Sequence, residues 1–198
     1  MHKQRWISRF LAASLLLLAL RITSPQDYGV WDAGILGWLS GLRTPALDQT
    51  MLAITWLGSL FVLAPATCLI SIRLASQGRH EDAWFLVYSL AGAALLGRLA
   101  KWWIERPRPD LHTWLSQLPL DTSYPSLHAL QATAFLLGLA LILNRKDFWP
   151  LAFVLAATIA ISRLYLQVHF PSDIVAGALA AIVWTLSLHW TREKAHAK

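Results

Sequence analysis

Apolar residues along this chain gather into long runs separated by short polar segments. A helix needs about 20 apolar residues to cross the core of a bilayer. Six runs come close to that length: residues 6–22, 47–74, 82–104, 125–143, 148–166 and 171–190. The pattern therefore predicts an all-α polytopic membrane protein, a bundle of six transmembrane helices. Ala176, Gly177, Ala178, Ala180 and Ala181 would let the last span pack closely against its neighbours.

The first run also fits a secretory signal peptide, because it has a basic start and an apolar middle. A signal peptide ends in a cleavage site of small residues, whereas Arg21 and Ile22 follow here. We therefore expect an uncleaved span at residues 6–22.

Residues 30–42 form a shorter apolar segment between the first two runs. Its large apolar side chains recur at helical spacing, at Trp31, Ile35, Trp38, Leu39 and Leu42. We predict a short helix that lies at the membrane interface and ends at Thr44-Pro45. A packed loop is the alternative.

Composition narrows the class of protein. Hydrophobic residues make up 56% of the 198 residues and charged residues 14%, against about a quarter charged in an ordinary soluble domain. The net charge of +6 is scattered between apolar runs, which suits anionic lipid headgroups and not a nucleic-acid partner. The length suits one domain, residues 1–198. Cys68 is the only cysteine, so an intrachain disulfide is impossible.

Basic residues set the expected orientation. With a cytoplasmic N-terminus, ten of the seventeen Lys and Arg residues face the cytoplasm, as the positive-inside rule favours. They are Lys3, Arg5, Arg9, Arg73, Arg79, Arg145, Lys146, Arg192, Lys194 and Lys198. We expect an integral protein of a bacterial cytoplasmic membrane, with both termini inside the cell.

Three polar segments stand out, at residues 101–109, 124–128 and 162–173. The first follows the third span, the second opens the fourth, and the last joins the fifth to the sixth. In the six-span layout all three therefore reach the same membrane face, the periplasmic or outer one.

Lys101, Arg108 and Arg163 bring three cations to this face. Ionised groups at membrane depth are costly unless they are paired or hydrated, and three like charges repel one another. An anion with several oxygens resolves both problems, because arginine offers forked donors and lysine a compact charge.

The start of the fourth span adds further donors. Pro125 suits the first helical position, which would leave the amides of Ser126, Leu127 and His128 free at a helix N-terminus. Such amides bind phosphate, and the Ser126 hydroxyl can add a hydrogen bond.

His169 and Asp173 form the reactive half, four residues apart at the start of the sixth span. A carboxylate bonded to one ring nitrogen fixes the tautomer and leaves the other nitrogen free to attack. His128 is then the natural general acid, and later the base that activates water. Because one histidine must be neutral and the other protonated, we expect a bell-shaped pH profile.

The same residues allow other interpretations. A metal site at His169 and Asp173 is disfavoured, because the three cations would repel Zn²⁺ or Mg²⁺. We expect no metal and no other cofactor. Glu105 and Arg106 are interpreted as a local ion pair without a role in the chemistry.

Together the segments resemble the type-2 phosphatidic acid phosphatase and vanadium haloperoxidase superfamily, in its membrane lipid phosphatase branch. The first family motif is Lys, six residues, then Arg-Pro, matched by Lys101 and Arg108-Pro109. The second, Pro-Ser-Gly-His, is matched at residues 125–128 except for its glycine. The third is Ser-Arg, five residues, His, three residues and Asp, matched at residues 162–173. The resemblance covers about residues 48–190.

The resemblance implies a role for each matched residue. His169 would form a phosphohistidine intermediate, Asp173 would orient it, and His128 would act as acid and base. The phosphoryl oxygens would be held by Lys101, Arg108, Ser126, the Leu127 amide and Arg163. Phosphatases of the family need no metal.

Leu127 departs from the motif, since the family usually has glycine there. A leucine amide can still hold phosphate, but the side chain must turn away, toward the lipid or the leaving group. Leucine also occurs here in some phosphotransferase-like branches, which keeps transfer to another lipid as an alternative.

The expected activity is hydrolysis of a lipid phosphate or diphosphate whose tails stay in the bilayer. Undecaprenyl diphosphate, phosphatidylglycerol phosphate and phosphatidic acid are the candidates, in that order. The alternatives are a lipid phosphotransferase and a non-enzymatic membrane scaffold or transporter. Haloperoxidase activity is disfavoured, because those members are soluble and larger. The expected partners are lipids, and no oligomeric state follows from the sequence.

Overall fold

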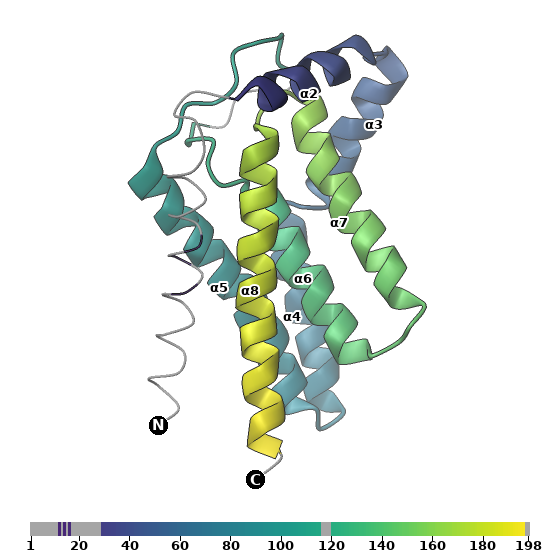
Figure 1. The fold of residues 1–198 in the computed structure, drawn as a ribbon. Coiled ribbons are helices and arrows are strands. Elements are labelled where there is room, and N and C mark those ends of the chain that lie inside the picture. Colours follow the sequence, from purple (N-terminus) through teal and green to yellow (C-terminus); the bar gives the residue numbers. More distant parts are fainter. Residues whose placement is uncertain (1–11, 13, 15, 17–28, 116–119, 197–198) are drawn as a thin grey trace.

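The computed structural model describes residues 29–115 and 120–196, together with residues 12, 14 and 16. The described residues form helices and no strands, so the predicted all-helical class is confirmed. Figure 1 shows a bundle of helices with α2 lying across the end at which α8 begins. The predicted first span, residues 6–22, lies outside the described residues apart from those three positions.

Seven helices have described bounds. They are α2 (Val30–Gly41), α3 (Pro45–Trp56), α4 (Leu60–Ser76), α5 (His80–Ile104), α6 (Leu127–Leu143), α7 (Phe148–Tyr165) and α8 (Pro171–His196). Four of the predicted runs correspond to α5, α6, α7 and α8 within a few residues, apart from the longer C-terminal end of α8.

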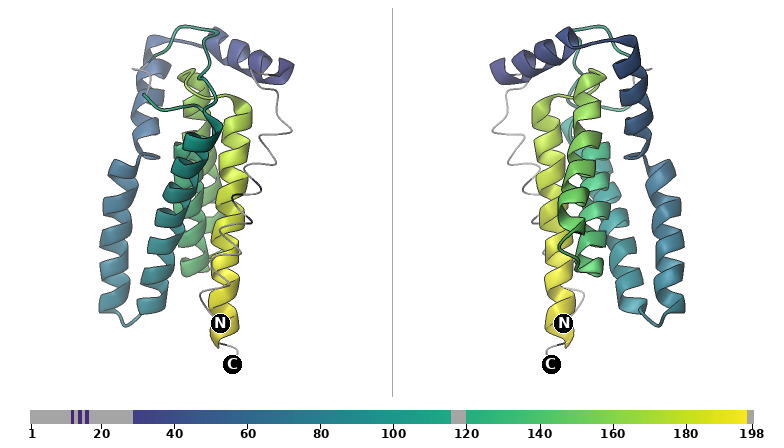
Figure 2. Two further views of the ribbon diagram at one scale, coloured as in Figure 1. Left: turned by 90° about the vertical axis from the view of Figure 1, so that its left-hand side faces the viewer. Right: turned by 90° about the vertical axis from the view of Figure 1, so that its right-hand side faces the viewer.

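The second predicted span is not one continuous helix. It is divided into α3 and α4, which are bent by 45° at a short break (Figure 2). The amides of Leu57, Gly58 and Ser59 bond to carbonyls three residues back, at 3.0, 3.1 and 3.0 Å. This tighter pattern ends α3. Gly58 is required at the break, because an added Cβ would lie 2.4 Å from Cγ2 of Ile159.

Three described helices, α5, α7 and α8, are long and apolar enough to cross a membrane. The bent α3–α4 pair makes a fourth if it is one span, whereas α6 is apolar but shorter. The count of six spans therefore stays a prediction.

The core is built around α6, which contacts α4, α5, α7 and α8. The predicted small residues of α8 permit this packing, since Ala176, Ala180 and Ala181 are buried. An added Cβ at Gly177 would lie 2.8 Å from the Ser126 carbonyl oxygen. The close approach brings the start of α8 against the start of α6.

The helix predicted at residues 30–42 is present as α2 and has two apolar faces. Leu36 and Leu39 are buried against the bundle, and Asp32 is buried with them. Trp31 and Trp38 are exposed on the outside. An exposed tryptophan face suits a membrane interface, and that placement stays a prediction.

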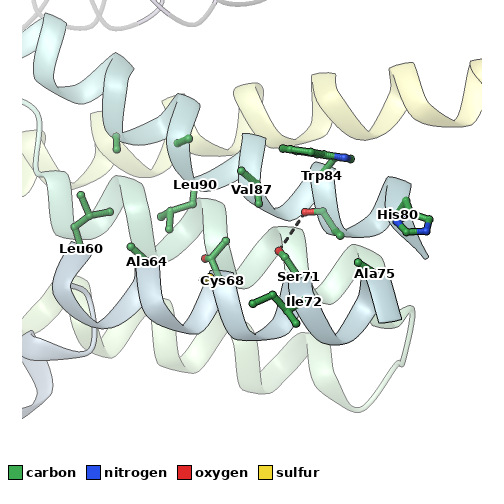
Figure 3. A pocket seen from close by; sticks show the side chains of 14 residues that line it. Leu60, Ala64, Cys68, Ser71, Ile72, Ala75, His80, Trp84, Val87 and Leu90 are labelled. Carbon is green, nitrogen blue, oxygen red and sulfur yellow. Dashed lines mark hydrogen bonds between the residues drawn. The ribbon is translucent and has the colours of Figure 1, made fainter. Parts of the chain in front are cut away.

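An apolar groove of about 760 Å³ lies between α4 and α5 (Figure 3). The Ser71 hydroxyl donates a hydrogen bond of 3.2 Å across it to the Ala83 carbonyl, and Cys68 also lines it. The groove follows the N-terminal half of α5, whereas Lys101 lies near the C-terminal end of that helix.

Candidate active site

The three polar segments lie at the α2 end of the bundle. α5 ends where Glu105 adopts a left-handed conformation, φ 46°, and two prolines keep the following residues out of a helix. The chain returns when the Ser123 amide donates to the Arg106 carbonyl at 2.8 Å. The α6 N-terminus then meets the start of α8, where the Ser126 amide donates to the Asp173 carbonyl at 3.1 Å.

His169 lies in the α7–α8 connection and is almost fully buried. Its Nδ1 is 3.4 Å from Asp173 Oδ2, and its Nε2 is 3.4 Å from Nη1 of Arg108. Asp173 Oδ2 also accepts hydrogen bonds from the Ser123 hydroxyl and, at 2.9 Å, from the Phe170 amide. One ring nitrogen thus faces a fixed carboxylate and the other faces a cation.

The surroundings of His169 favour its neutral form. Burial, together with the nearby charges of Arg108 and Arg163, holds the pKa of the imidazole well below its ordinary value. A neutral imidazole has the free lone pair that a nucleophile needs.

Arg108 and Lys101 are joined by a carboxylate that the sequence analysis missed, Asp121. Arg108 donates to the Asp121 carboxylate at 2.5 Å and to its carbonyl at 2.9 Å. Lys101 Nζ lies 3.5 Å from the other carboxylate oxygen. Burial alone would raise the pKa of Asp121, but Lys101 and Arg108 hold it below its ordinary value. An anion is thus already favoured between these two cations.

Arg163 approaches from α7 and is buried. Its Nη1 donates to the Thr55 hydroxyl at 2.7 Å, while its Nε has no hydrogen-bond partner among the described residues. A buried donor without an acceptor costs free energy, so this guanidinium is suited to a bound anion.

The start of α6 differs from its prediction. The helix begins at Leu127 and not at Pro125, because Ser126 is the N-cap residue, whose hydroxyl accepts from the Ala129 amide at 3.5 Å. The Ser126 amide is bonded to Asp173 and is not free, as it was predicted to be. The amides of Leu127 and His128 remain as first-turn donors without acceptors in the helix.

The Leu127 side chain is partly exposed and packs toward α5. An added Cβ at Gly97 would lie 2.4 Å from Leu127 Cδ2. Gly97 thus forms a notch that holds the leucine side chain while its amide stays at the helix start.

This packing predicts a compensating pair of substitutions. Gly97→Ala should destabilise the protein by about 1–3 kcal/mol, because the added methyl group overpacks the notch. Leu127→Gly introduced into the same chain should remove most of that cost. Thermal unfolding in detergent of both single variants and the double variant measures the coupling. If the effects of the two substitutions on thermal unfolding simply add, the Leu127 side chain does not pack into the notch at Gly97.

His128 is partly buried on the first turn of α6. An added Cβ at Gly58 would lie 3.3 Å from its ring carbon Cδ2, so the break between α3 and α4 packs against this imidazole. His128 comes two residues after Ser126, whose amide bonds to the Asp173 carbonyl, so its ring lies at the same end of the bundle as His169.

Arg106 was wrongly predicted to pair locally with Glu105. Glu105 is exposed, whereas Arg106 is fully buried and donates to Asp173 Oδ1 at 2.6 Å and to Asp32 Oδ2 at 3.1 Å. A sequence signal existed for Asp32, because it is the one charged residue in the apolar segment 30–42.

Comparisons with known proteins identify the family to which the chain belongs. The sequence profile of the PAP2 superfamily matches residues 82–197, more than half of the chain. The chain is 29% identical over 182 residues to phosphatidylglycerophosphatase B of Bacillus subtilis (strain 168), covering 86% of each protein. It is 28% identical over 178 residues to the undecaprenyl-diphosphatase of Sulfolobus acidocaldarius, covering 88% of this chain and 84% of the relative.

A solved structure shares the fold. The crystal structure of a transmembrane PAP2 type phosphatidylglycerolphosphate phosphatase from Bacillus subtilis has a TM-score of 0.74 and 26% identity, covering 96% of each chain. With the apolar helices described above, this identifies the chain as an integral membrane protein. The profile match also spans the predicted site residues, Lys101 to Asp173.

Proposed function

Because this chain belongs to the PAP2 superfamily, we propose that it is a lipid phosphatase that hydrolyses a lipid phosphate or diphosphate through a phosphohistidine. The observation that carries the proposal is the placement of His169, with Nδ1 facing Asp173 and Nε2 facing Arg108. A nucleophilic nitrogen and a phosphate-binding cation thus meet at one point.

The first step forms a bond from His169 Nε2 to phosphorus and breaks the bond from phosphorus to the leaving oxygen. His128 donates its proton to that oxygen. Asp173 keeps the Nδ1 proton in place and stabilises the positive imidazole ring that results. In the second step His128 takes a proton from water, whose oxygen attacks phosphorus and releases phosphate and neutral His169.

Lys101, Arg108, Arg163 and the amides of Leu127 and His128 surround the phosphoryl oxygens in this proposal. Asp121 supports the assignment, since its carboxylate bridges Lys101 and Arg108 as a phosphate oxygen would. The Nε of Arg163, which has no hydrogen-bond partner in the described part of the chain, is a further donor for the bound anion. These groups stabilise the negative charge on the phosphoryl oxygens in the transition state, while the charge that develops on the leaving oxygen is neutralised by the proton from His128.

The substrate is proposed to be a lipid because the site lies at the end of an apolar bundle, beneath a helix with exposed tryptophans. The names of the relatives support undecaprenyl diphosphate and phosphatidylglycerol phosphate as candidates, with phosphatidic acid third. Transfer to another lipid has no specific support, because the Leu127 side chain, whose departure from the motif suggested it, packs toward Gly97.

We place the site on the periplasmic side of a bacterial cytoplasmic membrane, with cytoplasmic termini. The support is the distribution of basic residues. A cysteine introduced at Asp110, which is exposed at the site end, should react with an impermeant reagent added outside intact cells. Labelling only after membrane disruption would contradict this orientation.

The activity is tested by phosphate release from a panel of lipid monophosphates and diphosphates in detergent micelles, with and without a chelator. We expect release from at least one of these lipids and no loss with the chelator. Release that stops on chelation would contradict the metal-free mechanism. Lipid product formed by transfer, without free phosphate, would favour the phosphotransferase.

The pH dependence follows from the lowered pKa of His169. The imidazole stays neutral at pH values where an ordinary histidine, with a pKa of about 6.5, is already protonated. The acidic limb of kcat/KM should therefore lie well below pH 6.5. The rates are measured on two lipids whose phosphate groups have different pKa values. An acidic limb at the same pH for both lipids belongs to the enzyme, whereas a limb that differs between the lipids belongs to the substrate. An acidic limb at or above the ordinary histidine value for both lipids would contradict the burial argument.

A further inference from the structure

A buried arginine links the carboxylate beside His169 to a helix that is distant in sequence. Arg106 Nη1 donates to Asp173 Oδ1 at 2.6 Å, and Nη2 donates to Asp32 Oδ2 at 3.1 Å. The side chains of all three residues are completely buried. The two oxygens of Asp173 therefore have separate partners: Oδ1 faces Arg106, and Oδ2 faces His169.

Asp32 is itself held rigidly. The Ser172 amide donates to its Oδ1 at 3.0 Å, and the Ser172 hydroxyl donates to its Oδ2 at 2.8 Å. The guanidinium of Arg106 lies over the Phe170 ring, 4.2 Å from its centroid, which adds a cation–π contact. The network thus joins α2, the segment after α5 and the first turn of α8.

The two carboxylates of this network, Asp32 and Asp173, require the positive charge of Arg106 between them. Two buried carboxylates without a cation would repel each other and lose hydration, and breaking a buried ion pair is strongly unfavourable. Arg106 supplies that cation. Unlike Arg108, which is near Nε2 of His169, Arg106 directs both Nη atoms at carboxylates. Its position therefore suits orientation of Asp173 and not contact with phosphate.

We propose that Arg106 and Asp32 are positioning residues that act on His169 through Asp173. Arg106 holds Oδ1 of Asp173, so Oδ2 stays turned toward Nδ1 of His169 and the opposite nitrogen points at the phosphoryl group. Asp32 fixes the direction of Arg106 and makes α2 part of the active site. This inference rests on the proposed function, because it assigns the two residues a role in that same reaction.

The test is a steady-state comparison of Asp32→Asn with the unaltered protein. Asparagine keeps the size of aspartate and one oxygen acceptor but removes the charge that directs Arg106. We expect kcat to fall by about ten- to hundred-fold, as it does when a partner that orients a metal-bound histidine is removed. KM should stay unchanged, because the contact acts on the nucleophile and not on the bound lipid.

Arg106 provides the second pair of variants. Arg106→Met removes the charge and should lower kcat more than Asp32→Asn does. Arg106→Lys keeps a charge at the same depth and should recover part of the lost kcat. If Arg106→Met fails to fold, the comparison of Arg106→Lys with Asp32→Asn still reports on the network.

Asp82→Asn is the matched control. It breaks the ion pair of Asp82 with Arg192 near the opposite end of the bundle, and should lower Tm without changing kcat or KM. If Asp32→Asn behaves like this control, with a lower Tm and unchanged kcat, the positioning role is wrong. A raised KM with unchanged kcat would also overturn it.

The two proposals fail in different ways. An unaltered protein that releases no phosphate from any lipid of the panel refutes the proposed function and this inference with it. An active unaltered protein whose Asp32→Asn variant keeps its full kcat refutes the positioning role alone.

Discussion

Replacing His169 with alanine should lower kcat by on the order of a thousand-fold or more, the scale seen when a nucleophile is removed. The structure offers no second imidazole with a carboxylate on one nitrogen and a cation on the other among the described residues at this site. Phosphate release from a lipid substrate, measured in detergent at saturating concentration, gives the value.

His80→Ala is the control for that experiment. His80 is exposed at the first residue of α5, at the end of that helix far from Lys101. Its loss should leave kcat unchanged. If His169→Ala keeps full activity while remaining folded, His169 is not the nucleophile.

Replacing Arg163 with alanine should have the second largest effect, a fall in kcat/KM of about a hundred- to a thousand-fold. This is the cost typical of removing one donor that stabilises developing charge. Arg163→Lys should recover only part of it, because an ammonium group cannot reproduce the planar fork. The measurement is kcat and KM for both variants, together with the inhibition constant of orthovanadate as a phosphate analogue.

Thr55→Val separates positioning from contact in the same experiment. It removes the hydroxyl that accepts from Arg163 at 2.7 Å but leaves the guanidinium in place. Its effect should be much smaller than that of Arg163→Ala. An Arg163→Ala variant that binds orthovanadate as tightly as the unaltered protein would show that Arg163 does not contact the phosphoryl group.

Hydropathy gave the helical class and most of the helix positions, since long apolar runs in a membrane protein have few alternatives to a helix. It could not show the break at Gly58. That residue lies within a continuous apolar run, and its close approach to Ile159 and His128, which are far away in sequence, appears only in the folded chain. The local sequence pattern does not show contacts between residues that are far apart in the chain.

Motif spacing singled out residues of the candidate site but not the groups that hold them. Arg106 stands in a run with Arg108 and looks like a surface charge, yet its partner Asp32 is 74 residues away. Asp121 carries no spacing signal at all. The direction of Leu127 likewise depends on Gly97, because an empty notch in another helix decides where the side chain fits.

The central claim, that phosphate passes through His169, is tested most directly by trapping the intermediate. The His128→Ala variant lacks both the acid of the first step and the base of the second. With a lipid diphosphate, whose phosphate leaving group needs no proton, the phosphohistidine should still form but hydrolyse slowly. The protein is mixed with a radiolabelled lipid diphosphate, quenched in alkali and digested. The account predicts label on the peptide that contains His169 and none in a variant that also carries His169→Ala. Steady phosphate release without a labelled protein, or label on another residue, would contradict it.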